Sequence, residues 1–277
     1  MTVQRVDPVA LGLLASAIAR EAGALLLDGF EGTRTVEAKT TPTDAVTEMD
    51  RASEALIVRR ILEMRPDDGI LAEEGAARDG RTGVRWVIDP LDGTVNYLYR
   101  RPDFAVSIAA EVAGEVVAGE VVAGAVFAPA RAELFAATLG GGATLNGVPI
   151  HPSDEARLAH ALCGTGFGYD AEVRRAQGAV LGRVIHEVRD VRRAGSAALD
   201  LCAVACGRLD TYYERGLQPW DGAAASLIVR EAGARCETLP AATPDAAPTW
   251  IAANAALFPT FRALIVAATD SSTPPRP

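Results

Sequence analysis

The chain lacks the composition of a nucleic-acid-binding protein. Its formal net charge is -9, and only 5% of its 277 residues are aromatic. The arginines are scattered through helical patterns instead of being gathered along one stripe. Since a basic patch is the usual electrostatic footprint of nucleic-acid recognition, nucleic acid is not an expected partner.

Paired cysteines and long apolar runs are also missing. The four cysteines show no CxxC spacing, and Cys202 and Cys206 fit one face of an alanine-rich helix better than a metal site. The N-terminal segment lacks the ordered charged, apolar and cleavage regions of a signal peptide, and no later run has the length of a membrane span. We therefore expect reduced core cysteines, no membrane partner and a cytoplasmic location.

The composition that is present suits a folded enzyme. Apolar residues make up 49% of the chain and charged residues 23%. At this length we expect one domain over residues 1–277 with two lobes. The first lobe spans about 7–150, the second spans about 151–268, and residues 269–277 form a flexible tail.

Helix signals open the first lobe and strand signals follow. Asp7 and Pro8 predict the start of a helix that ends near Phe30, and a second helix is expected from Thr47 to roughly Met64, after a polar loop. Short apolar segments separated by turn residues then predict strands, and the last three favour an antiparallel meander. The segments are 69–73, 84–89, 105–112, 115–129 and 131–138, followed by a glycine-rich turn and an edge element within 139–150.

The second lobe shows a regular alternation of strand and helix patterns. Such alternation predicts a layered α/β arrangement. The expected strands are 161–165, 190–194 and 209–214, and the expected helices are 171–188, 195–208 and 220–233; residues 241–249 are expected to form a surface loop.

The most informative segment is WVIDPLDGTVN at residues 86–96. An apolar strand is expected to end on Asp89, and Asp92, Gly93 and Thr94 are expected to open a helix. The carboxylates can hold hard cations, and the backbone N–H groups of Gly93 and Thr94 can face phosphate oxygens. The alternative is that Asp92 and Thr94 only cap a helix.

Further acidic residues stand at the ends of other predicted elements. Glu73 follows a strand, and Asp221 lies at the start of a helix. Each has an ordinary alternative, since Glu73 and Glu74 can be a solvated strand end and Asp221 a favourable charge in a first helical turn. Glu73 and Glu74 point to opposite faces if the strand continues, so at most one of them reaches a shared site.

Three other charged residues have strong structural explanations when taken alone. Thr47 and Asp50 have the spacing of a capping box, in which the acid bonds back to the helix start. Glu214, at the end of a strand, and Lys39, in a loop, are more often solvated charges than ligands.

Taken together, these segments resemble the inositol monophosphatase family, and most closely its bacterial branch, within a superfamily of lithium-sensitive, metal-dependent phosphatases. The resemblance covers nearly the whole chain and implies an αβαβα layered sandwich of the sugar phosphatase type. It rests on DAVTEMD at 44–50, EEG at 73–75, WVIDPLDGT at 86–94 and WDGAAAS at 220–226.

The resemblance implies a magnesium centre with two to three ions, for which Mn²⁺ can substitute. The implied ligands are the side chains of Glu73, Asp89, Asp92 and Asp221 and the backbone carbonyl of Leu91. The chemistry of the residues agrees, because four carboxylates crowded together repel one another unless divalent cations neutralise them.

The resemblance also implies roles in catalysis and substrate binding. Thr94, paired with Asp50, would orient a metal-bound water for direct attack on phosphorus, with Glu73 completing the catalytic set. Phosphate would meet Gly93 and Thr94. The polyol hydroxyls would meet Gly195, Ser196, Ala197 and Glu214. Asp92 and Asp221, which are also implied metal ligands, complete the substrate-binding set.

Inositol 1-phosphate is the first expected substrate, and a homodimer is usual in the family. Relatives with the same metal centre cleave histidinol phosphate, fructose 1,6-bisphosphate or nucleotide 3'-phosphates, so these remain alternatives. A non-catalytic metal-binding or interaction protein on the same fold is an alternative of another class. A haloacid-dehalogenase-type phosphatase is disfavoured, because two residues instead of one separate Asp89 from Asp92.

Overall fold

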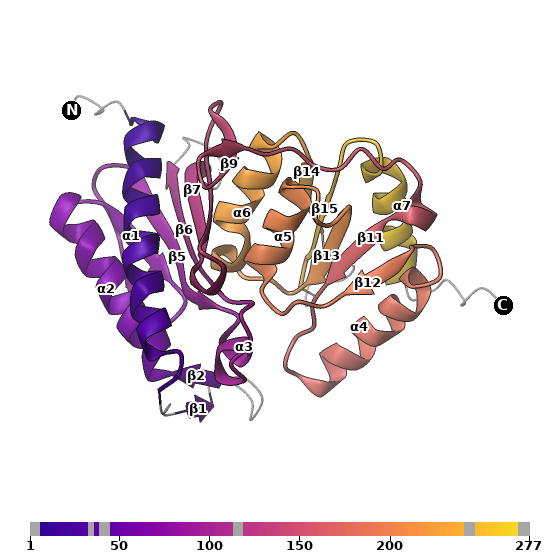
Figure 1. The fold of residues 1–277 in the computed structure, drawn as a ribbon, viewed down its shortest axis with the longest axis horizontal. Coiled ribbons are helices and arrows are strands. Elements are labelled where there is room, and N and C mark those ends of the chain that lie inside the picture. The colour runs from indigo at the N-terminus through magenta and orange to yellow at the C-terminus, as the bar shows by residue number, and fades with distance from the viewer. Residues whose placement is uncertain (1–5, 33–35, 39–44, 113–118, 241–246, 271–277) are drawn as a thin grey trace.

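Two β-sheets and three layers of helices stack in the order helix, sheet, helix, sheet, helix (Figure 1). The structure is a computed structural model that describes residues 6–32, 36–38, 45–112, 119–240 and 247–270. This arrangement confirms the predicted αβαβα sandwich. Each sheet has helices on both faces, so both faces can bury apolar side chains.

The first sheet has eight strands in the order β10-β9-β8-β7-β6-β5-β3-β4. It is antiparallel except between β3 and β5, and the predicted meander is confirmed for β6, β7 and β8. The strands are β3 (Gly69–Ala72), β4 (Ala77–Arg78), β5 (Val84–Asp92), β6 (Ala105–Val112), β7 (Glu120–Ala128), β8 (Glu133–Thr138), β9 (Gly142–Leu145) and β10 (Val148–Pro149).

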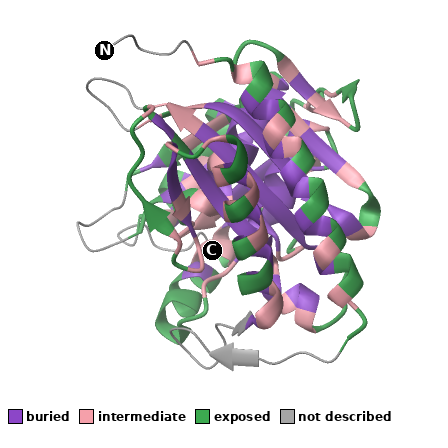
Figure 2. Ribbon diagram, turned by 90° about the vertical axis from the view of Figure 1, so that its left-hand side faces the viewer, coloured by how far each residue is buried: buried purple, intermediate pink, exposed green. Residues whose placement is uncertain are grey.

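Two long helices, α1 (Pro8–Gly29) and α2 (Glu48–Met64), cover the outer face of this sheet (Figure 1). Both begin as predicted, with Asp7 accepting a hydrogen bond from the Val9 N–H and Thr47 accepting one from the Met49 N–H. The buried positions of α1 recur every three or four residues, and Figure 2 shows the exposed turns facing outward with the buried strands behind them. By length and composition α1 is apolar enough to cross a membrane, and here its buried face packs in the core against the first sheet.

The second sheet has five strands in the order β12-β11-β13-β15-β14. Strands β12, β11 and β13 are parallel, and β15 is antiparallel to both of its neighbours. Their bounds are β11 (Leu162–Thr165), β12 (Asp190–Arg192), β13 (Thr211–Arg215), β14 (Arg235–Leu239) and β15 (Thr249–Ala253).

The inner helix layer consists of α5 (Ala197–Ala205) and α6 (Pro219–Glu231), which lie between the two sheets. Their alanine-rich sequences fit this position, because small side chains allow close packing on both sides. The outer layer on the second sheet consists of α4 (Ala171–Val184) and α7 (Phe258–Thr269). The middle layer brings the start of α5 and the start of α6 close to the end of β5 in the first sheet.

Several sequence expectations need correction. The strand expected to end on Asp89 continues to Asp92, with an irregular register between the two residues. The strand expected from residue 131 begins at Glu133, because residues 129–131 form a 3-10 turn. All four cysteines are free as expected, but Cys206, which caps the end of α5, and Cys236 are half-buried and not core residues.

Other elements were not predicted, namely the short ribbon of β1 (Val36–Ala38) and β2 (Ala45–Thr47), the edge strand β4, and the segments β14, β15 and α7. Lys39, the start of the strand expected at 115–129, most of the loop expected at 241–249 and most of the tail lie outside the described residues.

Candidate functional site

The end of β5 forms an irregular turn that presents two carboxylates. Asp89 Oδ1 accepts a hydrogen bond from the Leu91 N–H at 3.0 Å, which fixes the turn around Pro90. The Pro90 carbonyl accepts a bond from Ser53 Oγ of α2 at 2.8 Å, so the turn is also tied to the outer helix. The strand therefore remains paired while its side chains are redirected.

Asp89 lies at the centre of a group of acidic side chains. Its side chain is only 2% exposed, and burial raises its pKa well above the usual value, with the Glu73, Asp92 and Asp221 carboxylates acting in the same direction. Glu73 follows β3, the parallel neighbour of β5, and its N–H donates to the Ile88 carbonyl at 3.2 Å. Asp221 comes from the first turn of α6. The structure thus brings together acids from three separate elements.

The chemistry of this group fits divalent cations. Buried carboxylates that raise one another's pKa values are stabilised when cations replace the shared protons. In the described residues, no three acidic, histidine or cysteine side chains form a closed set of metal ligands. Asp92 Oδ2 and Asp221 Oδ2 instead accept bonds from protein donors, and since a carboxylate has about four lone-pair sites, capacity for a cation remains.

Thr94 and Asp50 form a second feature beside the acidic group. The Thr94 hydroxyl lies 2.9 Å from Asp50 Oδ1 and 3.1 Å from the Leu91 carbonyl oxygen. The other oxygen of Asp50 accepts bonds from the Thr47 N–H at 2.8 Å and the Thr47 hydroxyl at 2.6 Å. Asp50 is 1% exposed, and burial raises its pKa. The expected capping box is confirmed. It uses Asp50 Oδ2, whereas Thr94 contacts Asp50 Oδ1.

Gly93 allows the chain to turn sharply between the two features. It precedes the short helix α3 (Thr94–Leu98) with φ at 93°, a value that favours glycine, and a Cβ at this position would lie 2.8 Å from the Asp103 carbonyl oxygen. The Asn96 side-chain amide of α3 donates to that same carbonyl at 2.7 Å and to the Ala194 carbonyl at 2.8 Å. Asn96 therefore holds α3 against the loop that contains Gly195.

Asp92 connects the end of β5 to the start of α5. Its Oδ2 atom accepts bonds from the Ser196 hydroxyl at 2.5 Å and from the Ala198 N–H at 2.8 Å. Burial raises the pKa of Asp92 to about 6, although these bonds lower it. Ser196 is also the cap of α5, and its hydroxyl accepts from the Leu199 N–H at 3.3 Å. The start of α5, including Gly195, Ser196 and Ala197, is in this way held beside the end of β5.

Glu214 lies on β13 at the opposite side of the site. Burial raises its pKa to about 7, and the Tyr212 hydroxyl, which donates to its Oε2 atom at 2.5 Å, lowers it. A Cβ at Gly166 would fall 1.9 Å from the same Oε2 atom, so the backbone of Gly166 lies directly against the carboxylate. Glu214 is therefore not a solvated strand end, as its sequence position alone would suggest.

Four side chains at this site were missed from the sequence, and two of them carry charge. Burial raises the pKa of Asp200 to about 8, with Glu214 and Asp92 adding to the effect and Arg193 opposing it. Arg193 acts on the Glu214 pKa as well. Arg193, two residues before Gly195, and Asp200, four residues after Ser196, are visible in the sequence as charged residues. Their approach to Glu214 on β13 is not. The set is Asn96, Arg193, Asp200 and Tyr212.

The turn that carries Glu73 and Glu74 is held by a glutamate of α2. The Glu74 N–H donates to Glu54 Oε2 at 2.8 Å, and the Ala76 N–H donates to Glu54 Oε1 at 3.1 Å. This turn after β3 is thus fixed by α2, while Glu73 lies within electrostatic reach of Asp50, Asp89 and Asp92.

The comparisons with known proteins agree with this geometry. The family model described as "Inositol monophosphatase family" matches residues 9–268. The chain belongs to the inositol monophosphatase family. Members of the family are phosphatases that depend on metal ions, so the coarse chemistry of the site follows from this membership.

Individual members of the family are similar over most of their length. An inositol-1-monophosphatase of Mycobacterium leprae is 46% identical over 266 residues, which cover 87% of each chain. The Nus factor SuhB of Escherichia coli strain K12 is 44% identical over 223 residues, or 79% of this chain and 82% of that protein. The crystal structure of the extragenic suppressor protein suhB from Bartonella henselae superposes with a TM-score of 0.83 at 34% identity, covering 95% of this chain and 99% of that one.

Proposed function

We propose that the protein hydrolyses a phosphate monoester with the aid of Mg²⁺, and that inositol 1-phosphate is its substrate. The observation that carries this proposal is the convergence of Glu73, Asp89, Asp92 and Asp221 beside the hydrogen-bonded pair of Thr94 and Asp50. The members come from four separate places in the chain, namely the end of β3, the end of β5 with the start of α3, the start of α6 and the start of α2, so a purely local structural role does not explain the convergence.

The acidic group would hold the cations. Carboxylate and carbonyl oxygens are the ligands that Mg²⁺ prefers, and the Leu91 carbonyl lies within the same turn as Asp89 and Asp92. When bound, Mg²⁺ supplies positive charge that polarises phosphate oxygens and makes an attacking water more acidic. Mn²⁺, with similar preferences, would substitute.

Thr94 would position the attacking water. Its hydroxyl has one proton, and when Asp50 is ionised that proton is donated to Asp50 Oδ1. The lone pairs of Thr94 Oγ1 are then available to accept a proton from water. The bonds from Thr47 to Asp50 Oδ2 keep this carboxylate oriented and favour its charged form. Glu73, beside Asp89, would complete the catalytic set.

The phosphate would bind next to this water, and the polyol would extend from the phosphate on the side away from the water, because attack occurs in line with the leaving oxygen. The N–H groups of Gly93 and Thr94 lie at the start of α3, where helix N–H groups have no intrahelical acceptor. Glu214 Oε2 accepts from Tyr212, which leaves Oε1 to accept from neighbouring hydroxyls of a polyol. The loop of Gly195, Ser196 and Ala197, together with Asp92 and Asp221, would close the remaining side.

Inositol 1-phosphate is favoured over other monoesters by two observations. A carboxylate that accepts from vicinal hydroxyls suits a cyclic polyol, and several similar proteins are named inositol-1-monophosphatases. Histidinol phosphate, fructose 1,6-bisphosphate and nucleotide 3'-phosphates remain the alternative substrates. We also propose a cytoplasmic homodimer.

A second candidate function is a non-catalytic or additional role as an interaction protein. The observation that favours it is the 44% identity to an Escherichia coli protein named as a Nus factor. Every proposed ligand and water-positioning residue is retained in this chain, which favours the enzyme.

The deciding experiment measures phosphate release by chelator-treated protein from each of the four substrates, with Mg²⁺, without it, and with Li⁺ added. Fastest release from inositol 1-phosphate, dependent on Mg²⁺ and inhibited by Li⁺, would support the proposal. A different best substrate would replace the substrate and retain the mechanism. No release from any substrate, with Mg²⁺ still bound in calorimetry, would favour the interaction protein.

A further inference from the structure

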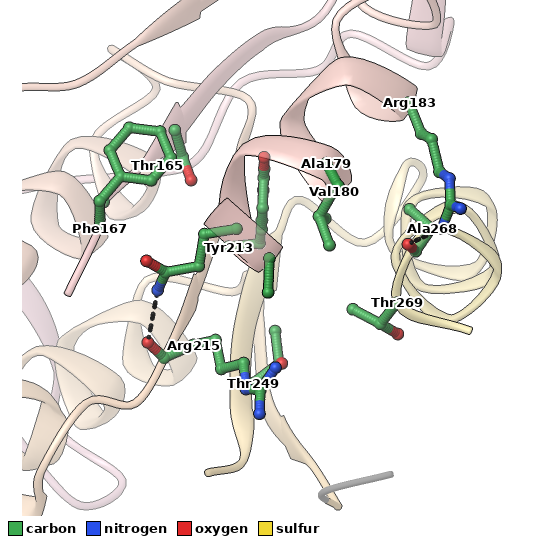
Figure 3. A pocket seen from close by; sticks show the side chains of 13 residues that line it. Thr165, Phe167, Ala179, Val180, Arg183, Tyr213, Arg215, Thr249, Ala268 and Thr269 are labelled. Carbon is green, nitrogen blue, oxygen red and sulfur yellow. Dashed lines mark hydrogen bonds between the residues drawn. The ribbon is translucent and has the colours of Figure 1, made fainter. Parts of the chain in front are cut away.

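A pocket of about 340 Å³ opens on the outer face of the second sheet, between α4 and α7 (Figure 3). Apolar atoms of Phe167, Ala179, Val180 and Ala268 form much of its wall. A single water needs only roughly 10–15 Å³, whereas small-molecule sites span roughly 300–1,000 Å³. The pocket is therefore large enough for a small organic ligand.

Two buried hydroxyl groups lie in the wall of this pocket, on adjacent strands. Thr165 at the end of β11 is 1% exposed, and Tyr213 of β13 is 5% exposed. Each hydroxyl oxygen has less than 1 Å² of exposed surface. A hydrogen bond with the Thr165 hydroxyl opposes the effect of burial, which raises the Tyr213 pKa to about 12. The two hydroxyls therefore pair with each other, and they lie beneath the apolar surface of the pocket.

The charge of the pocket is positive. Arg183 and Arg215 line it, and none of the described residues that line it is acidic. Arg183 is anchored by its Nη1 atom, which donates to the Ala268 carbonyl at 2.7 Å (Figure 3). Arg215 has no ion-pair partner among the described residues. A guanidinium group of this kind attracts a carboxylate or a phosphate.

The polar amide of Gln177 is already used and does not take part. Its Nε2 atom donates to the Arg215 carbonyl at 3.1 Å, and its Oε1 atom accepts from the Gly168 N–H at 2.9 Å. The first bond joins α4 to β13 (Figure 3). The second joins α4 to the segment after β11, so the pocket has a fixed rim.

The pocket is separate from the candidate active site. Tyr213 packs with the outer core of the second sheet, whereas Tyr212 packs with the inner core and bonds to Glu214. Successive residues of a strand point to opposite faces, so the pocket and Glu214 lie on opposite sides of β13. A ligand in the pocket would not occupy the place of the substrate.

We propose that this pocket binds a small amphipathic organic anion. Its apolar body would pack against Phe167 and Val180, and its negative group would face Arg215. This site does not depend on the proposed function, because no residue of the acidic group contributes to it.

The test is a titration of the full chain with 3-phenylpropanoate, followed by amide chemical shifts in two-dimensional NMR. Two further probes separate the contributions, since 3-phenylpropanamide lacks the charge and acetate lacks the apolar body. We expect saturable shifts at Phe167, Gly168 and Gly178 with 3-phenylpropanoate, and weaker binding of both other probes. Equal binding of the amide, or no saturable shift at these residues, would overturn the proposal.

Variants of the pocket sharpen the test. We expect Arg215→Gln to weaken binding by roughly tenfold. Ala179→Trp adds bulk at an exposed wall position and should abolish binding. Arg174→Gln, an exposed arginine of α4 that does not line the pocket, is the matched control and should bind like the parent protein. Unchanged binding in both Arg215→Gln and Ala179→Trp would place the ligand elsewhere.

Discussion

The Thr94 hydroxyl contacts Asp50 at 2.9 Å, although 44 positions separate the two residues in the chain. The same aspartate closes the capping box of α2 through its other oxygen. The local sequence explains Asp50 fully as part of a helix cap. The packing of α2 against β5 also places Asp50 where it can orient Thr94. The two roles support each other, because the cap fixes the carboxylate that Thr94 needs.

Substitution of Thr94 tests this relationship. We expect Thr94→Ala to lower kcat by roughly 10²–10⁴-fold, the usual contribution of positioned proton transfer, with little change in Mg²⁺ affinity. Thr94→Ser retains the hydroxyl and is the matched control, for which we expect most of the activity. Phosphate-release kinetics and calorimetric Mg²⁺ titration provide the measurements. A loss of the same size in both variants would mean that the methyl group, and not the hydroxyl, is what matters.

Removal of one carboxylate charge tests the acidic group. Asp89→Asn should abolish Mg²⁺-dependent turnover and also the rise in Tm that Mg²⁺ gives the parent protein, because ligand binding stabilises the folded state. The metal-free variant should be no less stable than the metal-free parent, since a buried charge among other acids has been removed. Asp79→Asn at an exposed position is the control. A normal Mg²⁺-induced shift in the Asp89 variant would remove Asp89 from the ligands.

Glu214 can be tested in two independent ways. Glu214→Gln removes the charge, and Gly166→Ala places a methyl group where the carboxylate now lies, so that the flexible end of Glu214 must move. We expect both variants to lose roughly tenfold or more in kcat/KM for inositol 1-phosphate, as expected when hydrogen bonds to a charged group are lost. Hydrolysis of an aryl phosphate should change little. Equal losses on both substrates would show that Glu214 supports the fold and not polyol recognition.

Stability of the metal-free protein should depend on pH. The pKa values of Asp92, Glu214 and Asp200 are raised to about 6, 7 and 8. Between these values and their ordinary ones the folded chain holds protons that the unfolded chain has released, so the free energy of unfolding falls as pH rises. Carboxylates with lowered pKa values, such as Glu155 at about 2, titrate below this range.

Urea denaturation of chelator-treated protein at about pH 5.5 and about pH 8 checks this expectation. We expect lower stability at the higher pH, and a larger stabilisation by Mg²⁺ there, because the cation replaces protons. Equal stability at both pH values in the absence of metal would contradict the proposed crowding of these acids.

The sequence predicted local structure well where one signal dominated. Asp7 with Pro8 and Thr47 with Asp50 placed the starts of α1 and α2, since capping depends only on nearby residues. The sequence did not predict elements whose strand pairing involves residues distant in the chain. Strands β14 and β15 and helix α7 were not predicted, because their apolar segments are short and gain their structure from neighbours in the second sheet. Strand β5 was predicted to end at Asp89 because a proline follows. In the structure the register shifts after Asp89, and pairing resumes at Asp92.

The sequence by itself determined the residue types of the site, the helix caps and the layered α/β class, because these follow from chemistry and spacing within short segments. Only the tertiary structure decided which acids meet. Asp200 and Arg193 approach Glu214, and Asp92 reaches Ser196, because α5 is packed between two sheets whose strands are distant in the chain. The pocket between α4 and α7 likewise depends on how these two helices pack on the second sheet, which no local pattern records.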